Sequence, residues 1–241
     1  MINEKTVSDA IEYRRSVRVF SDKDLDSEIV KKCLYNASLA PNSSNLQLWE
    51  FVHVNDDKVL KKLSKACFNQ NAAKTAKQLV VIVVRKDLWK KRANWNIEVI
   101  SNQSKNSQIS EKRIKQAKTY YKKVIPTLYT DFFGILGILK SLIFQTIGLF
   151  RPTMRQVMSS DIRVVAHKSA GLAAQNFMIS MAAIGYDTCP MEGSDTLKVK
   201  NILNLPSGSE INMVIGCGIR TNEGVYGDQL RVPFNEVYTY I

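Results

Sequence analysis

Residues 79–84 limit the fold of this chain more strongly than any other stretch of its sequence. Their sequence is LVVIVV, an apolar run in which five of the six side chains are β-branched. A run without polar alternation, bounded here by Gln78 and Arg85, predicts a central strand buried on both faces. The chain has 241 residues, enough for one sizeable core, so we expect a single domain over residues 1–241.

The spacing of apolar residues predicts the elements around this strand. Further strands are expected at residues 49–54 and 211–215, and a short strand or extended segment at residues 14–20. Helices are expected at residues 6–14, from Asp26 or Ser27 to before Pro41, at residues 59–67 and at residues 165–184. No strict βαβ order and no G-x-G-x-x-G after a strand are present, so the pattern favours an α+β arrangement of helices on a sheet over a Rossmann domain.

The charge balance limits the classes of partner. Lys and Arg outnumber Asp and Glu by 34 to 22, but the basic residues are separated by apolar ones at helical spacing, which favours solvated helix faces over nucleic-acid binding. The four cysteines are far apart and form no C-x-x-C pair, so we expect buried thiols in a reducing compartment and no metal site. The first residues lack the apolar core of a secretory signal, which favours the cytoplasm.

Residues 132–150 form a second long apolar stretch, close to the roughly 20 residues that span a bilayer. Lys140 lies near its middle, and a central lysine costs about 2.5 to 3.5 kcal/mol on membrane-insertion scales. A span is therefore not expected. We favour an inserted arm that packs on a partner subunit or covers a ligand pocket, and we rank contact with a membrane interface below it.

Two polar segments are candidates for ligand binding. Arg14, Ser16 and Arg18 place two guanidinium groups and a hydroxyl within five residues, a set suited to phosphate, although a surface basic cluster would look the same. The loop at residues 40–49, APNSSNLQLW, is rich in amides that can bind a heteroaromatic ring. His53 and His167 fit structural positions, and Ser16 has no patterned His and Asp partner, so nucleophilic catalysis is not favoured.

Taken together, RRSVR at residues 14–18, the loop at 40–49 and PMEG at 190–193 resemble the nitroreductase family. The resemblance covers residues 4–85 and 161–233. It implies an α+β fold whose central, mostly antiparallel sheet is flanked by helices, in an intertwined homodimer with FMN at the subunit interface. Residues 86–160 match poorly and would form a helical arm or lid inserted in the domain.

The resemblance also implies the roles of individual residues. The phosphate and ribityl chain would be bound by Arg14, Arg15, Ser16 and Arg231, and Arg18 would lie near flavin N1 and O2. The other subunit would supply Pro41, Asn42, Ser43, Asn45 and Gln47. The pyrimidine edge would meet Asn69, with Gln70. A loop over one ring face would contain Cys189, Pro190, Met191, Glu192 and Gly193, with the Glu192 backbone N–H toward N5. Gln229 and Leu48 depart from the lysine and proline common at these positions, so a phosphate contact by Gln229 is left open.

The activity implied is that of an FMN-dependent oxidoreductase. NADH or NADPH would give electrons, which then pass to a nitroaromatic, quinone or flavin in a separate stage, and no side chain would act as a catalytic acid or base. Two alternatives are left open. One is another flavin reaction in the same fold, such as dehalogenation or flavin fragmentation, with residues 86–160 as its lid. The other is a flavin-binding or membrane-associated accessory protein with little turnover.

Overall fold

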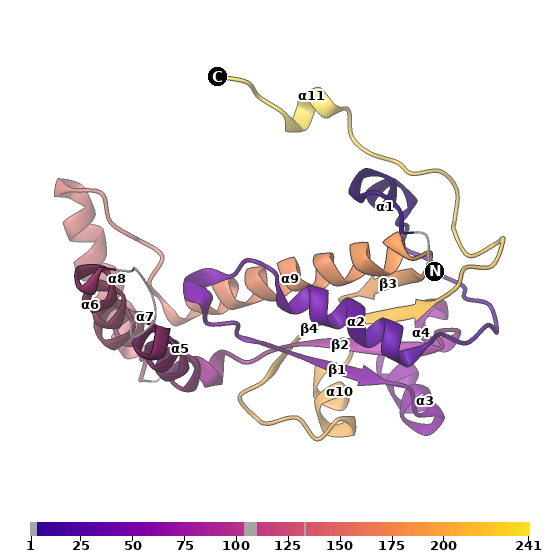
Figure 1. Ribbon diagram of the computed structural model, residues 1–241, viewed down its shortest axis with the longest axis horizontal. Coiled ribbons are helices and arrows are strands. Elements are labelled where there is room, and N and C mark those ends of the chain that lie inside the picture. Colours follow the sequence, from indigo (N-terminus) through magenta and orange to yellow (C-terminus); the bar gives the residue numbers. More distant parts are fainter. Residues whose placement is uncertain (1–3, 104–109, 133) are drawn as a thin grey trace.

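A four-stranded antiparallel sheet forms the centre of the protein. The computed structural model describes residues 4–103, 110–132 and 134–241. In the sheet the strands follow the order β1-β2-β4-β3, and each neighbouring pair is antiparallel (Figure 1). Their bounds are β1 (Trp49–Val54), β2 (Gln78–Val84), β3 (Asp187–Met191) and β4 (Glu210–Gly218). The predicted α+β class with an antiparallel sheet is confirmed.

Strand β2 lies between β1 and β4, and residues 79–84 are all fully buried, as their sequence predicts. Successive side chains of a strand point to opposite faces, which divides these six residues between two clusters. One cluster contains Val80, Ile82 and Val84; the other contains Leu79, Val81 and Val83. The sheet therefore has an apolar core on each side.

Helices cover both faces of the sheet (Figure 1). Helices α2 (Ser27–Ser38) and α9 (Ser159–Ala183) supply the first core, and α1 (Val7–Tyr13) packs on α9. Helices α3 (Asp57–Ala66), α4 (Asn71–Lys74) and α10 (Thr196–Ile202) supply the second. The starts of α1 and α2 are capped by Thr6 and Asp26, whose side chains accept hydrogen bonds from Asp9 N at 3.2 Å and Glu28 N at 2.8 Å.

Residues 14–20, predicted as a short strand or an extended segment, make isolated bridges at Ser16 and Phe20 and form the extended segment. The structure corrects two other predicted elements. Helix α9 begins at Ser159, six residues before the predicted start, because the Asp161 carboxylate accepts from Met158 N at 3.0 Å and caps the helix there. Strand β4 continues through the predicted stop to Gly218 because it pairs with both β2 and β3.

Residues 86–158, here called the helical lobe, project from one end of the sheet (Figure 1). The lobe contains η2 (Lys86–Leu88), α5 (Trp89–Gln103), α6 (Glu111–Thr119), the π-helical turn η3 (Tyr120–Val124), α7 (Ile125–Tyr129) and α8 (Ile135–Phe150). Ala93 and Ile125 are buried in the first core and fasten the lobe to it. No helix in the described ranges is both long and apolar enough to cross a bilayer.

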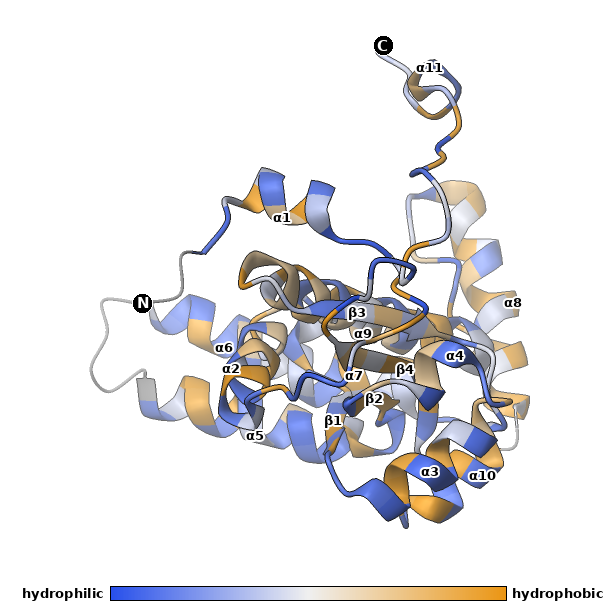
Figure 2. Cartoon of the chain, turned by 90° about the vertical axis from the view of Figure 1, so that its right-hand side faces the viewer, coloured by the Kyte–Doolittle hydropathy of each residue, from blue (hydrophilic) through white to orange (hydrophobic). Residues whose placement is uncertain are grey.

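The chain leaves the body after β4 as an extended tail. Residues 226–241 are exposed, and the tail contains only the four-residue α11 (Phe234–Val237). Figures 1 and 2 show α11 and the C-terminus well away from the sheet. All four cysteines are buried and free.

Candidate functional site

The segment at residues 14–18 is held in an extended form beside β3. Val17 is fully buried and its N–H donates to the Thr188 carbonyl at 3.1 Å. Arg18 N donates to the Gly224 carbonyl at 2.6 Å, and a Cβ on Gly224 would lie 2.5 Å from the Val19 oxygen, so this close approach requires glycine. Because side chains alternate along extended backbone, Ser16 and Arg18 point away from the core that receives Val17.

These residues line a polar cavity of about 220 Å³ together with residues from the far end of the chain. Its lining includes Arg14, Arg15, Ser16, Arg18, Tyr226, Asp228, Gln229 and Arg231. We call it the arginine cavity. The structure thus brings together the four residues predicted at the phosphate and ribityl chain of FMN, Arg18, which was predicted near flavin N1 and O2, and Gln229, although more than 200 positions separate Arg14 from Arg231.

The arginine cavity concentrates positive charge. Burial lowers the pKa of Arg14, and the nearby charges of Arg231 and Arg15 lower it further. Among the described residues, no carboxylate makes a salt bridge with any of the four cavity arginines. Arg15 donates instead to the Gly227 carbonyl at 2.9 Å. Guanidinium groups that line one cavity without a salt-bridge partner favour the binding of an anion, and a phosphate group accepts several charge-assisted hydrogen bonds from such groups.

A buried ion pair that the sequence did not predict anchors this segment. Arg220 donates through Nε to Asp187 Oδ1 at 2.8 Å and through its backbone N to Oδ2 at 2.7 Å, and Asp187 is only 2% exposed. Arg220 Nη2 also donates to the Tyr13 carbonyl at 3.0 Å, and the guanidinium lies 4.2 Å from the centre of the Tyr13 ring. The end of α1, and with it Arg14, is therefore fixed against β3 and β4.

The turn after α3 contacts the residues that follow β3. Gln70 Nε2 donates to the Gly193 carbonyl at 2.8 Å, and Asn69 has a positive φ of 53°. The prediction of a loop over residues 189–193 needs correction, because Cys189, Pro190 and Met191 belong to β3, where they pair with residues of β4. Only Glu192 and Gly193 lie beyond the strand, and both are exposed.

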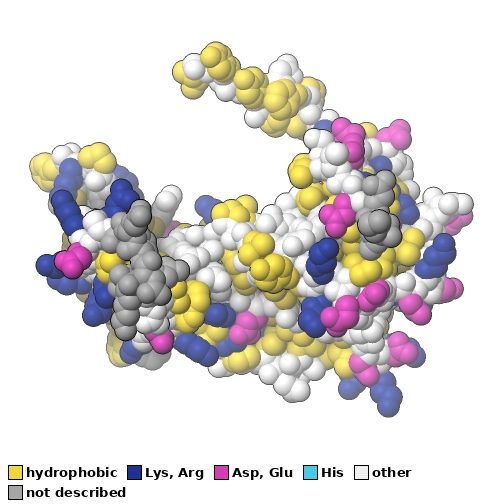
Figure 3. All heavy atoms as spheres, in the orientation of Figure 1, with side chains coloured by type: hydrophobic (Ala, Val, Ile, Leu, Met, Phe, Trp, Pro, Cys, Tyr) yellow, Lys and Arg dark blue, Asp and Glu magenta, His cyan; other side chains and the backbone are white. Residues whose placement is uncertain are grey.

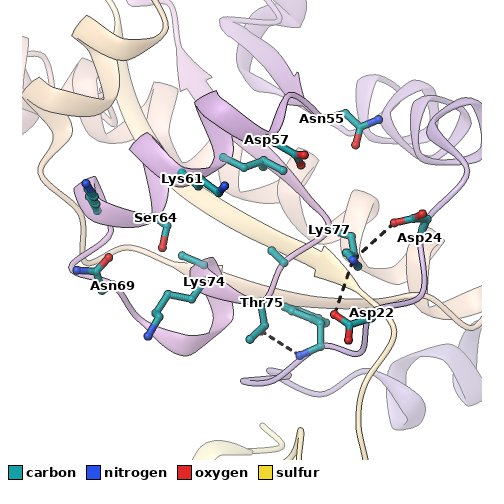
Figure 4. Close-up of a pocket in the computed structure, with 15 residues that line it drawn as sticks. Asp22, Asp24, Asn55, Asp57, Lys61, Ser64, Asn69, Lys74, Thr75 and Lys77 are labelled. Atoms are coloured by element: carbon teal, nitrogen blue, oxygen red, sulfur yellow. Dashed lines mark hydrogen bonds and ion pairs between the residues drawn. The ribbon is translucent and has the colours of Figure 1, made fainter.

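Asn69 lies in a different cavity from the arginines. This cavity, of about 590 Å³, lies between α3, α4 and residues 20–24, and none of the four cavity arginines lines it. Figure 4 shows Asn69 near Ser64 at one end and Asp22 and Asp24 at the other, where both approach Lys77 at 3.9 and 3.7 Å. The structure therefore does not place Asn69 among the residues of the arginine cavity.

The amide-rich loop, predicted at residues 40–49, covers residues 39–48 between α2 and β1 and lies at the other end of α2. Asn42 Oδ1 accepts from Gln47 N at 2.8 Å, while Asn45 Nδ2 donates to Asn96 Oδ1 at 3.1 Å and ties the loop to α5. Ser43 N donates to Ser169 Oγ of α9 at 3.3 Å. Residues 14–18 precede α2 and residues 39–48 follow it, so a single chain does not bring Pro41, Asn42, Ser43, Asn45 and Gln47 to the arginine cavity (Figure 1).

Both histidines have partners within the fold. His53 Nε2 lies 2.7 Å from Gln78 Oε1, and His167 Nε2 lies 3.2 Å from Glu210 Oε2. Neither histidine lines the arginine cavity. These contacts agree with the structural positions that their sequence context favours.

A family model and the curated relatives of this chain indicate the same family. A family model described as the nitroreductase family matches residues 11–219. The Bacillus subtilis protein MhqN, whose name assigns it provisionally to the NAD(P)H nitroreductases, is 26% identical over 238 residues, which cover 96% of this chain and 97% of MhqN.

Two solved structures share the fold. The structure of YdfN from Bacillus subtilis has a TM-score of 0.74 and 23% identity, covering 97% of this chain and 98% of its own. A structure from Exiguobacterium sibiricum, solved in complex with FMN, has a TM-score of 0.68 and 18% identity, covering 98% of both chains. At these identities the likeness concerns the fold, and the family model supplies the assignment: the chain belongs to the nitroreductase family.

Proposed function

We propose that the protein is an FMN-dependent oxidoreductase that acts as a homodimer and passes electrons from NADH or NADPH to a small organic acceptor. The observation that carries this proposal is the arginine cavity, in which four arginines and one carboxylate, Asp228, line the same space and, among the described residues, no salt bridge joins them. A phosphate monoester brings close to two negative charges and three acceptor oxygens, which fits such a set. The FMN complex of the Exiguobacterium sibiricum structure supports the same cofactor here.

Each group around the cavity has a distinct task in this proposal. Arg14, Arg15 and Arg231 bind the phosphate, and the Ser16 hydroxyl binds the ribityl chain. Arg18 supplies positive charge where the reduced isoalloxazine becomes anionic, which favours reduction. Glu192 is exposed just beyond β3, and in this proposal its backbone N–H donates to flavin N5.

The second subunit completes the site in this proposal. Helix α2 has 12 residues, about 18 Å of helix, and it separates residues 14–18 from the amide-rich loop, none of whose residues lines the arginine cavity. The amides of Asn42, Asn45 and Gln47 would therefore reach a flavin bound by the other copy. The contact between Asn45 and Asn96 fixes this loop for that task. The helical lobe would then act as a support for the loop beside the partner's cofactor.

Bound FMN supplies the redox chemistry, taking a hydride from NAD(P)H and giving up two electrons to the acceptor in a separate, ping-pong stage. The chain's own residues bind, orient and polarise, and none of them has to exchange a proton with the substrate. Nitroaromatics, quinones and free flavins are the acceptors that we propose. The name of MhqN supports a nicotinamide donor.

Anaerobic stopped-flow absorbance tests the activity, with loss of the oxidised flavin band on mixing the FMN-loaded protein with NADH or NADPH as the expected result. Binding of FMN and of riboflavin, which lacks the phosphate, tests the site. Arg14→Gln and Arg231→Gln each remove charge-assisted hydrogen bonds of about 1.5 to 3 kcal/mol, so each should raise the Kd for FMN about tenfold or more.

The matched control is Arg151→Gln, an exposed arginine outside the cavity, which should leave the Kd for FMN unchanged. The Kd for riboflavin should change little in all three variants. Equal loss of FMN and riboflavin affinity in the cavity variants would assign the arginines to another ligand. Absence of flavin reduction by both nucleotides would refute the oxidoreductase.

A further inference from the structure

Helix α8 exposes a continuous apolar face. Its exposed large side chains recur at helical spacing, and they include Ile135, Ile138, Leu139, Leu142, Ile143, Leu149 and Phe150. Leu142 is 63% exposed, Ile143 57% and Phe150 85%. Figure 2 shows α8 as a largely apolar helix apart from the body of the protein. An apolar surface of this extent on one helix is typical of an interaction site.

Within the part of the chain that the structure describes, the polar contacts recorded for α8 are with the segments that flank it. Gly137 N donates to Asp131 Oδ1 at 3.1 Å, and Lys140 donates to the Thr130 carbonyl. Near the other end, Arg155 donates to Gln145 Oε1 at 2.7 Å. The buried position of Gly137 faces Met158 and Ser159 at the start of α9. The helix is thus held by its polar side, which leaves the apolar face turned outward.

The helical lobe that carries α8 also carries most of the protein's net positive charge. Residues 86–158 contain 14 Lys and Arg against four Asp and Glu, a net charge of +10 out of +12 for the whole chain. Lys112, Arg113 and Lys115 of α6 are exposed. Lys and Arg side chains gather over the lobe at the left end of the molecule (Figure 3). Trp95 of α5 is 48% exposed among them.

The apolar face of α8 and the net positive charge of the lobe together indicate whether a second copy of the chain or a lipid surface covers this face. A second copy of the lobe would bring another +10 to the contact, and like charges at close range oppose association. An anionic lipid surface attracts the same charge and receives apolar side chains at the boundary of headgroups and acyl chains. At 16 residues with Lys140 near its centre, α8 suits a position in that boundary rather than across the bilayer.

We propose that α8, assisted by the basic residues of the helical lobe, docks the protein on an anionic lipid surface. On sequence composition alone, packing on a partner subunit is favoured over contact with a membrane. The exposed apolar face of α8 and the positive charge concentrated in the lobe now favour contact with a membrane. The proposal goes beyond the proposed function and needs neither bound FMN nor turnover.

Flotation of the full-length, FMN-loaded protein with vesicles tests the proposal. We expect flotation with vesicles of phosphatidylcholine mixed with phosphatidylglycerol, and little with phosphatidylcholine alone. Raising the salt from ~0.1 to ~0.5 M should weaken the binding, because it screens the charges. The double variant Leu142→Gln and Ile143→Gln should bind about tenfold more weakly or worse, since both side chains are exposed and would otherwise enter the lipid.

Matched variants serve as controls. Leu197→Gln changes a side chain that is 66% exposed on α10, outside the lobe, and should bind vesicles as the unchanged protein does. Lys112→Glu with Lys115→Glu on α6 should weaken binding about tenfold or more, because each basic residue near an anionic surface is worth roughly fivefold. Lys62→Glu with Lys65→Glu, an equally spaced pair on α3, should weaken it less.

Three outcomes would overturn the proposal. The first is no flotation with anionic vesicles, and the second is equal loss of binding in the α8 and α10 variants. The third is a change in sedimentation of Leu142→Gln with Ile143→Gln without vesicles, which would make the face of α8 a protein interface. Far-UV circular dichroism and the flavin absorbance of each variant distinguish these outcomes from misfolding or from failure of the cofactor assignment.

Discussion

Arg220 shows how one partly buried side chain supports a site that it does not line. Its guanidinium joins the Tyr13 carbonyl to Asp187, so the residue before Arg14 is fixed to strand β3. The Asp187 side chain is 1% exposed and accepts from both the side chain and the backbone of Arg220. A buried carboxylate with such a partner is costly to disturb, because removal of its charge leaves the other charge buried.

Asp187→Asn should therefore lower the free energy of unfolding by about 3 to 5 kcal/mol. It should also weaken FMN binding, because Arg14 loses its fixed position. Urea unfolding and FMN titration measure the two effects. Asp22→Asn is the control: Asp22 is fully exposed at 3.9 Å from Lys77, so solvent screens the pair and its replacement should leave the free energy of unfolding almost unchanged. Equal effects of the two substitutions would show that the Asp187 pair does not anchor the segment.

The four buried cysteines should be unreactive in the folded protein. Burial raises the pKa of both Cys33 and Cys67 to about 11, and the pKa values of Cys189 and Cys217 are also raised by burial. The thiolate is the reactive form, and at pH 8 a thiol with a pKa of 11 is only about 0.1% ionised. The folded protein should react with an aromatic disulfide reagent far more slowly than the urea-unfolded protein. Rapid reaction of even one thiol before unfolding would contradict this.

Among the elements, α9 and β4 are joined by a charged contact at one end of the sheet. Glu210 of β4 forms an ion pair with Arg163 and lies 3.2 Å from His167, both on α9. Burial acts to raise the pKa of Glu210, but the hydrogen bonds and charges of His167 and Arg163 outweigh it, so the pKa lies below its usual 4.5. The contact therefore stabilises the fold only while Glu210 is ionised.

The sign of the pH dependence follows from that lowered pKa. The stabilisation is complete at pH values above the unfolded pKa and is lost as the pH falls through the lower pKa of the folded state. Glu210→Gln should lower the free energy of unfolding by about 0.5 to 1 kcal/mol at pH 7, and the difference from the unchanged protein should disappear at an acidic pH below the lowered pKa of folded Glu210. Urea unfolding at both pH values measures this. A difference that persists in acid would show that the charge of Glu210 is not responsible.

The elements also show what local sequence can predict. The apolar run of β2 and the caps Thr6 and Asp26 are local signals, and the structure has the corresponding elements. Strand β3 was missed because Pro190 and Gly193 give a turn signal, whereas its pairing with β4 depends on residues more than 20 positions away. The Asp187–Arg220 pair has no local signal. The convergence of Arg14, Arg18 and Arg231 followed only from the family resemblance.

At the scale of the whole molecule, the exposed tail is a segment that a second copy would cover in the proposed homodimer. Residues 228–241 are exposed, yet they include apolar side chains such as Phe234, Val237 and Ile241, and Arg231 of the cavity. Figure 3 shows apolar side chains along the projecting tail. Burial of such residues against a partner would contribute on the order of 1.5 kcal/mol or more for each large side chain.

Removal of residues 228–241 should therefore abolish dimerisation and FMN binding while the sheet and its helices stay folded. Sedimentation velocity, flavin absorbance and far-UV circular dichroism measure these three properties. A chain shortened only by residues 239–241 retains Arg231 and should still bind FMN. An unfolded product of the longer truncation would show that the tail stabilises its own chain, contrary to this expectation.

The position of α2 between the arginine cavity and the amide-rich loop has a consequence for mixed assemblies. If each cofactor takes its arginines from one copy and its amides from the other, then a chain altered at Arg14 and a chain altered at Asn42 are defective in different halves of the site. Joined in a heterodimer, they would place both defects at one cofactor position and leave the other position unaltered. Two inactive variants, unfolded and refolded together, would then regain up to half of the unaltered activity in each heterodimer. This complementation would follow because α2 separates the two halves of the site within one chain.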